Sequence, residues 1–274
     1  MVRNNNGMIT LQMLKDVLHT NSKVNELLLV YHGIKPSMRI IVDKEQPIQD
    51  ICASLHIPCV TAPFKIQPTD SHQPYSHKAV LALEGLSLVY IGTTAQLACE
   101  AEQRMDHKAL GDALGYPSCC SDFFVAHATQ QQQHDNDFFE PLLKEHDNTK
   151  QTVYDWKINP FIRLADYTLI SHIPCCLHCE ASQKIAQSYL YTLQQLRPEW
   201  CVALEQISRW SVLFIPQQAT YFLKHVQQAK AQHVMSTKQD ADAEWLQHNA
   251  LHIIDKHTIK TQDVKRGYLL HYDG

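Results

Sequence analysis

The chain is organised around Ser171-His172-Ile173-Pro174-Cys175-Cys176-Leu177-His178-Cys179-Glu180-Ala181-Ser182, a dozen residues that hold three of its nine cysteines and two of its histidines. A second segment, Gly115-Tyr116-Pro117-Ser118-Cys119-Cys120-Ser121-Asp122-Phe123-Phe124, repeats the pattern of a proline followed closely by paired cysteines. Thiolates are soft ligands suited to zinc, to iron–sulfur clusters and to copper(I). We therefore interpret the two segments as the halves of one metal centre.

Length, charge and cysteine usage narrow the class of protein. The 274 residues are enough to bury a sizeable core without help from a metal. No signal-peptide pattern is found near the N-terminus, and no apolar run approaches the roughly 20 residues that a bilayer requires. We therefore expect a cytoplasmic protein without a membrane partner, and in that compartment clustered cysteines favour metal binding or catalysis over disulfides. The net charge of −4 does not favour nucleic acid as a partner. The oligomeric state is left open.

Hydrophobic periodicity predicts an α+β fold with three parts. Residues 1–94 are expected to form a small α/β unit, residues 95–198 a helical region that carries the cysteines, and residues 199–274 a mixed α/β tail unit. Within the first part the patterns predict helices at residues 11–19 and 48–55, strands at 27–30 and 39–42, a loop at 63–74, and a hairpin formed by 79–83 and 86–91. In the tail they predict strands at 211–215 and 268–271 and a helix at 221–233.

Both cysteine segments are predicted to begin helices. A helix at residues 95–114 leads to the first segment, where Ser118 can cap a helix whose first turn holds Cys119 and Cys120. In the second segment Pro174 suits the first turn of a helix that continues to residue 196. There Cys175 and Cys179 would share one helix face, and the free amides of a helix N-terminus favour thiolates.

The candidate ligands leave the metal open. They are Cys119, Cys120, Cys175, Cys176 and Cys179, and His172 or His178 can replace one of them. Closed tetrahedral coordination would be structural zinc, whereas three cysteines around an iron–sulfur cluster would leave one iron open to a substrate. We expect an iron–sulfur cluster, 4Fe-4S rather than 2Fe-2S, with zinc as the alternative.

Two residues of the second segment are candidates for catalysis, and four cysteines are not. Cys176 can serve as a free thiol, and Glu180 as a proton carrier beside the metal. The isolated cysteines are expected to be small buried hydrophobic side chains; they are Cys52, Cys59, Cys99 and Cys201.

At these two segments the chain resembles a poorly characterised family, domain of unknown function 483. The resemblance is carried by the Gly-Tyr-Pro-x-Cys-Cys-x-x-Phe-Phe pattern at residues 115–124 and by a Ser-His-x-Pro-Cys-Ser-x-x-Cys-x-x-Ser pattern at residues 171–182. It covers residues 95–182 and implies that Cys119, Cys120, Cys175 and Cys179 are the shared positions. Cys176 stands where the family pattern has serine, which makes it a spare thiol. The family name supplies no activity.

Three functions are compatible with these residues. The first is an iron–sulfur enzyme that carries out sulfur transfer, desulfuration or redox chemistry on a small molecule or a nucleoside. The second is a binding module in which structural zinc supports the recognition of a protein or RNA partner. The third is a metal-free thiol enzyme that forms a reversible disulfide between Cys176 and Cys179 or between the two segments.

Overall fold

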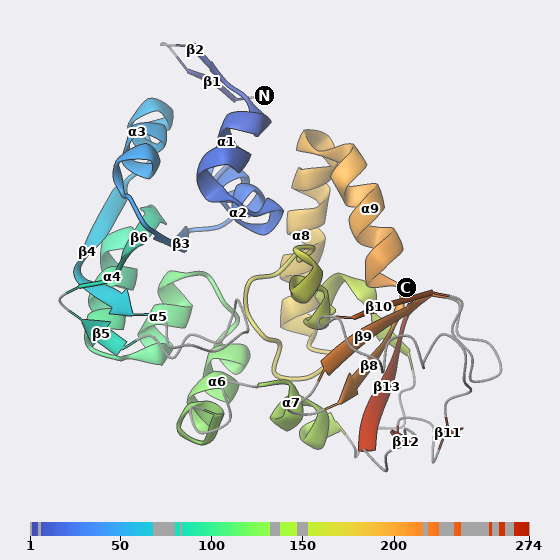
Figure 1. Cartoon of the computed structure of the whole chain (residues 1–274). Coiled ribbons are helices and arrows are strands. Elements are labelled where there is room, and N and C mark those ends of the chain that lie inside the picture. Colours follow the sequence, from blue (N-terminus) through green and yellow to red (C-terminus); the bar gives the residue numbers. More distant parts are fainter. Residues whose placement is uncertain are drawn as a thin grey trace.

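The computed structural model has an α+β fold, as predicted, with an N-terminal sheet wrapped by helices and a second sheet near the C-terminus (Figure 1). The structure describes residues 2–4, 7–67, 80–82, 84–131, 138–146, 153–215, 219–224, 233–236, 252–253, 258–260 and 266–273. Within these residues no helix is both long enough and apolar enough to cross a membrane.

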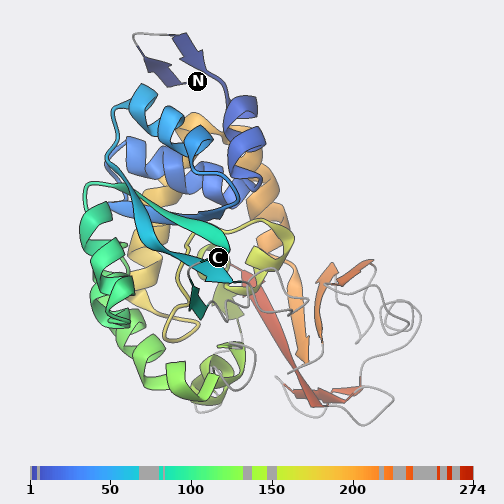
Figure 2. The ribbon, with the colours of Figure 1, turned by 60° about the vertical axis from the view of Figure 1, so that its left-hand side comes forward.

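The N-terminal sheet has four antiparallel strands in the order β3 (Ser37–Val42), β6 (Leu86–Gly92), β4 (Cys59–Gln67) and β5 (Val80–Ala82). Side chains of a strand point alternately to opposite faces. In β6, Val89 and Ile91 belong to one hydrophobic core, and Leu88 and Tyr90 belong to another. Because β6 is central and buried on both faces, it anchors two layers of helices (Figure 2).

Helices α1 (Leu11–Leu18), α2 (Asn21–Tyr31) and α3 (Gln46–Leu55) fill the core on one face of this sheet, and α4 (Ala95–Gln103) and α5 (His107–Ala113) fill the core on the other. Residues on both sides of position 94 therefore share one core. The single helix predicted at 95–114 is wrong, because Met105 adopts a positive φ of 54°. Asp106 then caps α5 by accepting a hydrogen bond from the amide of Ala109.

Three further predictions for this region are wrong. Residues 27–30, predicted as a strand, lie within helix α2, because a short buried aliphatic run does not distinguish a strand from a helix. Strand β5 pairs with β4 and not with β6, so residues 79–83 and 86–91 form no hairpin. The loop predicted at 63–74 is a strand as far as residue 67, and its remainder lies outside the described residues. A short antiparallel pair, β1 (Val2–Asn4) with β2 (Gly7–Ile9), precedes α1.

The rest of the chain packs helices against a second sheet. Its helices are α6 (Ser118–Gln131), α7 (Phe139–His146), α8 (Glu180–Leu196) and α9 (Pro198–Ser208), with 3-10 helices η2 (Trp156–Ile158) and η3 (Phe161–Ala165). Its strands are β7 (Val153–Asp155), β8 (Ser211–Ile215), β9 (Ala219–Lys224), β10 (His233–Ser236), β11 (His252–Ile253), β12 (Thr258–Lys260) and β13 (Arg266–Asp273).

In this sheet the order is β10-β9-β8-β13-β12-β11, and β7 runs parallel to β13. The helix predicted at 221–233 is wrong, because residues 221–224 belong to β9 and pair on both sides with neighbouring strands. Tyr221, Phe222 and Leu223 are all buried there. A short apolar run of this kind does not distinguish a buried strand from a buried helix, so the pairing decides.

Polar contacts fasten α2 to the second half of the chain. Asp166 accepts hydrogen bonds from the backbone amides of Asn21 and Ser22, at 2.8 and 3.2 Å, and so places its carboxylate at the N-terminus of α2. Such a carboxylate is stabilising because the helix dipole is positive there. Arg197, at the end of α8, donates to the side chains of Asn25 and Asn21. These contacts hold α2 beside the region that carries the cysteines.

Candidate metal centre

Four cysteine sulfurs from the two segments meet at one point. The Sγ atoms of Cys119, Cys120, Cys175 and Cys179 all lie within 4.8 Å of one another. The Sγ atoms of Cys119 and Cys120 are 3.9 Å apart, and each of them lies 3.7 Å from Cys179 Sγ. The prediction that the two segments form one cysteine cluster able to bind a metal is therefore confirmed.

Helix α6 presents the first pair of cysteines in its first turn, as predicted. The helix begins at Ser118 itself, so the predicted cap at Ser118 is wrong; the carbonyl of Pro117 accepts hydrogen bonds from the amides of Cys120 and Ser121. Residue Gly111 lets α5 lie against α6, because a Cβ there would come within 2.2 Å of Ser121 Oγ.

The second segment is a loop that ends in a helix. Helix α8 begins at Glu180, and Cys179 occupies the N-cap position, so the helix predicted to begin at Pro174 is wrong. Cys175 reaches the cluster from the loop. The residues before α8 form bends and a turn, in which the amide of Cys179 donates to the carbonyl of Cys176. A hydrogen bond from elsewhere in the fold holds this loop: Arg163 donates to the carbonyl of His172 at 2.8 Å. The helix N-terminus still lies beside a sulfur, at Cys179, where it favours a thiolate.

Four residues of the second segment that the sequence singled out lie outside the group of four sulfurs. Cys176 is half-buried, His178 is half-buried, and Glu180 is exposed on the first residue of α8. His172 is buried, and its Nε2 atom lies 2.8 Å from Ser182 Oγ. Of the seven predicted ligands, the structure thus brings together four cysteines. Ser182 lies between His172 and the sulfur of Cys120.

Hydrogen bonds distinguish the sulfurs from one another. Cys120 Sγ accepts from the amide of Cys175 at 3.4 Å and lies 3.3 Å from Ser182 Oγ. Hydrogen bonds from Cys120 and Cys175 lower the pKa of the Cys179 thiol. Burial lowers the pKa of His172 to about 3, so its imidazole is neutral beside the cluster.

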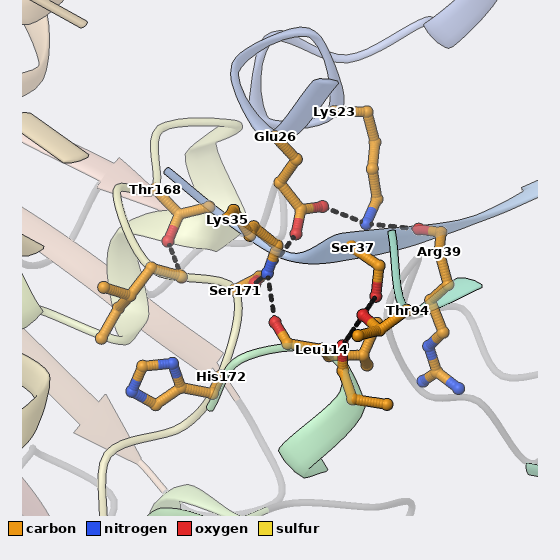
Figure 3. Close-up of polar contacts among 12 residues, drawn as sticks. Lys23, Glu26, Lys35, Ser37, Arg39, Thr94, Leu114, Thr168, Ser171 and His172 are labelled. Atoms are coloured by element: carbon orange, nitrogen blue, oxygen red, sulfur yellow. Dashed lines mark hydrogen bonds and ion pairs between the residues drawn. The ribbon is translucent and has the colours of Figure 1, made fainter. Parts of the chain in front are cut away.

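A buried lysine that the sequence did not single out joins the two segments (Figure 3). Lys35 is 1% exposed, and its Nζ atom donates to the carbonyl of Leu114 at 3.2 Å and to Ser171 Oγ at 2.9 Å. Leu114 immediately precedes the first cysteine segment, and Ser171 begins the second. The ammonium group also lies 4.9 Å from the ring centre of Tyr116, within range of a cation–π contact. The single ammonium group of Lys35 therefore hydrogen-bonds to the chain at the start of both cysteine segments.

Glu26 of α2 balances this charge. Its carboxylate lies 3.3 Å from Lys35 Nζ and 2.5 Å from Lys23 Nζ (Figure 3). Burial by itself would raise the pKa of Glu26, but the two lysines lower it from 4.5 to about 2. The pKa of Lys35 is raised despite its burial, because Glu26 lies beside it. No local sequence pattern indicates such a pair, because its partners come from separate elements.

The four isolated cysteines take no part in the cluster. Cys52, Cys99 and Cys201 are buried, as predicted, and Cys59 is half-buried. The sequence treated Cys52 and Cys59 as separate, yet a hydrogen bond between their thiols raises the pKa of Cys52 and lowers that of Cys59.

Comparisons of the chain with protein-family models, with curated proteins and with solved structures found no match. The resemblance to domain of unknown function 483 therefore stays a prediction.

Proposed function

We propose that the chain is a metalloprotein that binds one zinc ion through Cys119, Cys120, Cys175 and Cys179. A zinc–sulfur bond is about 2.3 Å long, so two sulfurs of a tetrahedral site lie about 3.8 Å apart. The closest sulfur pairs of this cluster are 3.7 to 3.9 Å apart. This match is the observation that carries the proposal.

The same distances give less support to an iron–sulfur cluster. In a 4Fe-4S cluster each cysteine binds a different iron, and inorganic sulfide fills the space between the irons. The cysteine sulfurs are then kept well beyond contact with one another. Here the sulfurs of Cys119, Cys120 and Cys179 lie 3.7 to 3.9 Å apart, and that of Cys175 lies within 4.8 Å of them, which suits a single ion in their centre.

Four thiolates around one ion leave no position open for a substrate, so the site supports the second of the three functions, a module with structural zinc. The ion would tie Cys119 to Cys179, which are 60 positions apart. It would thereby fix the junction that Lys35 also holds, between the end of α5 and the loop that begins at Ser171. In this proposal the folded surface recognises a protein or RNA partner.

One observation favours a second candidate, an enzyme that uses thiolate chemistry at the same site. Cys119 is exposed, whereas Cys120 and Cys179 are buried. A small electrophile would therefore reach Cys119 before the other two. Stoichiometric alkylation of the zinc-loaded protein, followed by peptide mass spectrometry, tests this: modification of Cys119 first supports the candidate, and modification of a buried ligand first contradicts it.

Metal and acid-labile sulfide content, measured on protein purified without oxygen, tests the proposed function. One zinc per chain without sulfide, and a colourless protein, are the expected results. Iron with sulfide and a broad visible absorption band would replace the proposal with the iron–sulfur enzyme. A protein that neither contains nor takes up any metal would leave the third function, thiol redox chemistry.

A further inference from the structure

A buried hydrogen-bond chain runs from one candidate ligand into the fold. Ser182 is 0% exposed, and its hydroxyl oxygen lies 3.3 Å from Cys120 Sγ and 2.8 Å from His172 Nε2. Ser182 is the third residue of α8, and Cys120 is the third residue of α6. The hydroxyl therefore connects the first turns of the two helices that carry ligands.

The direction of this chain follows from the chemistry of a bound thiolate. Metal-bound cysteine has lost its proton, so Cys120 Sγ can only accept a hydrogen bond. The hydroxyl of Ser182 lies beside Cys120 and also reaches Cys179, so it must donate its single proton to a thiolate, and its oxygen is left to accept from His172. The neutral imidazole of His172 must in turn carry its proton on Nε2.

The surroundings of His172 hold its ring in place for this role. Its carbonyl accepts from Arg163, and its ring centre lies 5.2 Å from that of Tyr116. Cys120 receives a second hydrogen bond from the amide of Cys175. Among the described residues, by contrast, no amide or hydroxyl donates to the exposed sulfur of Cys119.

We infer that Ser182 and His172 are positioning residues of the metal centre, which fix the Cys120 thiolate and make it a more weakly donating, less exchangeable ligand than Cys119. The inference rests on the proposed function, because it needs a metal bound to Cys120. Groups that hydrogen-bond to metal ligands in this way contribute about tenfold to a hundredfold to metal affinity. His172, expected from the sequence to be a ligand, would act on the metal through Ser182.

Three variants test the chain. Ser182→Ala removes the donor to the sulfur, and His172→Phe keeps an aromatic ring against Tyr116 but removes the donor to Ser182. His172→Gln is the matched control, because its amide group can replace the Nε2 donor. Circular dichroism of the zinc-loaded proteins checks that each variant has folded.

Two measurements are made on each protein: the dissociation constant of Zn²⁺ by chelator competition, and the absorption of the Co²⁺-loaded form. We expect Ser182→Ala and His172→Phe to weaken zinc binding about tenfold to a hundredfold. Their sulfur-to-cobalt charge-transfer band should move to longer wavelength, because a thiolate that loses a hydrogen bond is a stronger donor. His172→Gln should stay close to wild type in both. A merely structural defect would leave the position of the band unchanged, and that result would overturn the inference.

The tautomer of His172 gives an independent readout. The ¹⁵N chemical shifts of the imidazole in the zinc-loaded wild type should show a proton on Nε2 and none on Nδ1. A proton on Nδ1 alone would contradict the inferred direction even if zinc binds tightly. Failure of the wild type to bind Zn²⁺ or Co²⁺ through thiolates would instead contradict the proposed function, so the two failures are distinguishable.

Discussion

Cys175 and Cys176 are neighbours in the sequence, but only Cys175 belongs to the group of four sulfurs. This difference makes them a matched pair for substitution. Cys175→Ser should weaken zinc binding by at least about a hundredfold, because serine is a poor ligand for zinc and three thiolates remain. Cys176→Ser should leave the affinity within about twofold, since its sulfur lies outside the centre.

Chelator competition on the two purified variants measures both effects. Equal losses of affinity would show that Cys176 is also a ligand and would contradict the assignment of the four cysteines. An unchanged affinity in Cys175→Ser would contradict it more directly.

At the scale of single residues, the sequence identifies the cysteine cluster but not what surrounds it. Two segments in which paired cysteines closely follow a proline are more typical of a ligand site than of buried hydrophobic cysteines. The sequence therefore predicts Cys119, Cys120 and Cys179 at one site. The sequence predicts His172 as a ligand because histidine nitrogens and cysteine sulfurs often bind the same metal. In the structure Ser182 lies between His172 and Cys120 Sγ. Lys35 carries no local signal, because its partners come from α2, from the end of α5 and from the loop at Ser171.

At the scale of elements, the turn between α5 and α6 depends on Gly115. Its φ is +76°, and a Cβ there would come within 2.6 Å of the ring of Pro36. Gly33 has a similar φ of +69°, with nothing within 4 Å of its Cβ position. Gly33→Ala should therefore cost only the left-handed backbone strain, about 1 kcal/mol. Gly115→Ala should cost about 1 to 3 kcal/mol more, because Pro36 or the turn must also shift.

Urea unfolding of the two glycine variants measures the difference. Because the turn at Gly115 leads into the first cysteine pair, Gly115→Ala should also weaken zinc binding, and Gly33→Ala should not. Equal stability of the two variants would contradict the close packing of Pro36 against this turn.

The junction formed by Lys35 is a second prediction at this scale. Lys35→Met should destabilise the protein by about 3 to 5 kcal/mol, because it leaves the buried carboxylate of Glu26 without its buried partner. Lys23→Met is the matched control; Lys23 is 31% exposed, and its loss should cost about 1 kcal/mol or less. Equilibrium unfolding in urea compares them. A smaller loss for Lys35→Met than for Lys23→Met would show that the closer, partly exposed Lys23 matters more to folding than the buried Lys35.

Elements with strong local signals were predicted well, and those decided by distant contacts were not. The helix at the first cysteine pair follows from its local sequence. The start of α8 was placed at Pro174, six residues early, because Pro174 suits a first helical turn. Hydrogen bonds to the loop from Lys35 and Arg163 hold it in a series of bends and a turn instead. Likewise β9 was predicted as a helix, because strand pairing with β8 and β10 is not visible in the run itself.

For the whole molecule, the charge of Glu26 predicts how stability depends on pH. Burial raises the pKa of Glu26, but Lys23 and Lys35 outweigh it and lower the pKa from 4.5 to about 2 in the folded protein. The folded state therefore binds this proton less readily than the unfolded state does. The resulting stabilisation is fully present above pH 4.5 and is lost as the pH falls from 4.5 toward 2.

The difference in unfolding free energy between wild type and Glu26→Gln isolates this effect, because the variant cannot titrate at position 26 and both proteins lose metal in acid. The difference should be constant from pH 7 to pH 5 and should shrink below pH 4.5. A difference that grows as the pH falls would contradict the lowered pKa.

In the proposed function of the whole molecule, a single metal ion joins the two segments through four cysteines. X-ray absorption spectroscopy at the metal edge tests it most directly, on protein purified without oxygen and without added metal. We expect a zinc edge with four sulfur neighbours at about 2.3 Å and no second metal in the outer shells. An iron edge with a short iron–iron distance, or a zinc site with nitrogen or oxygen in place of one sulfur, would contradict it.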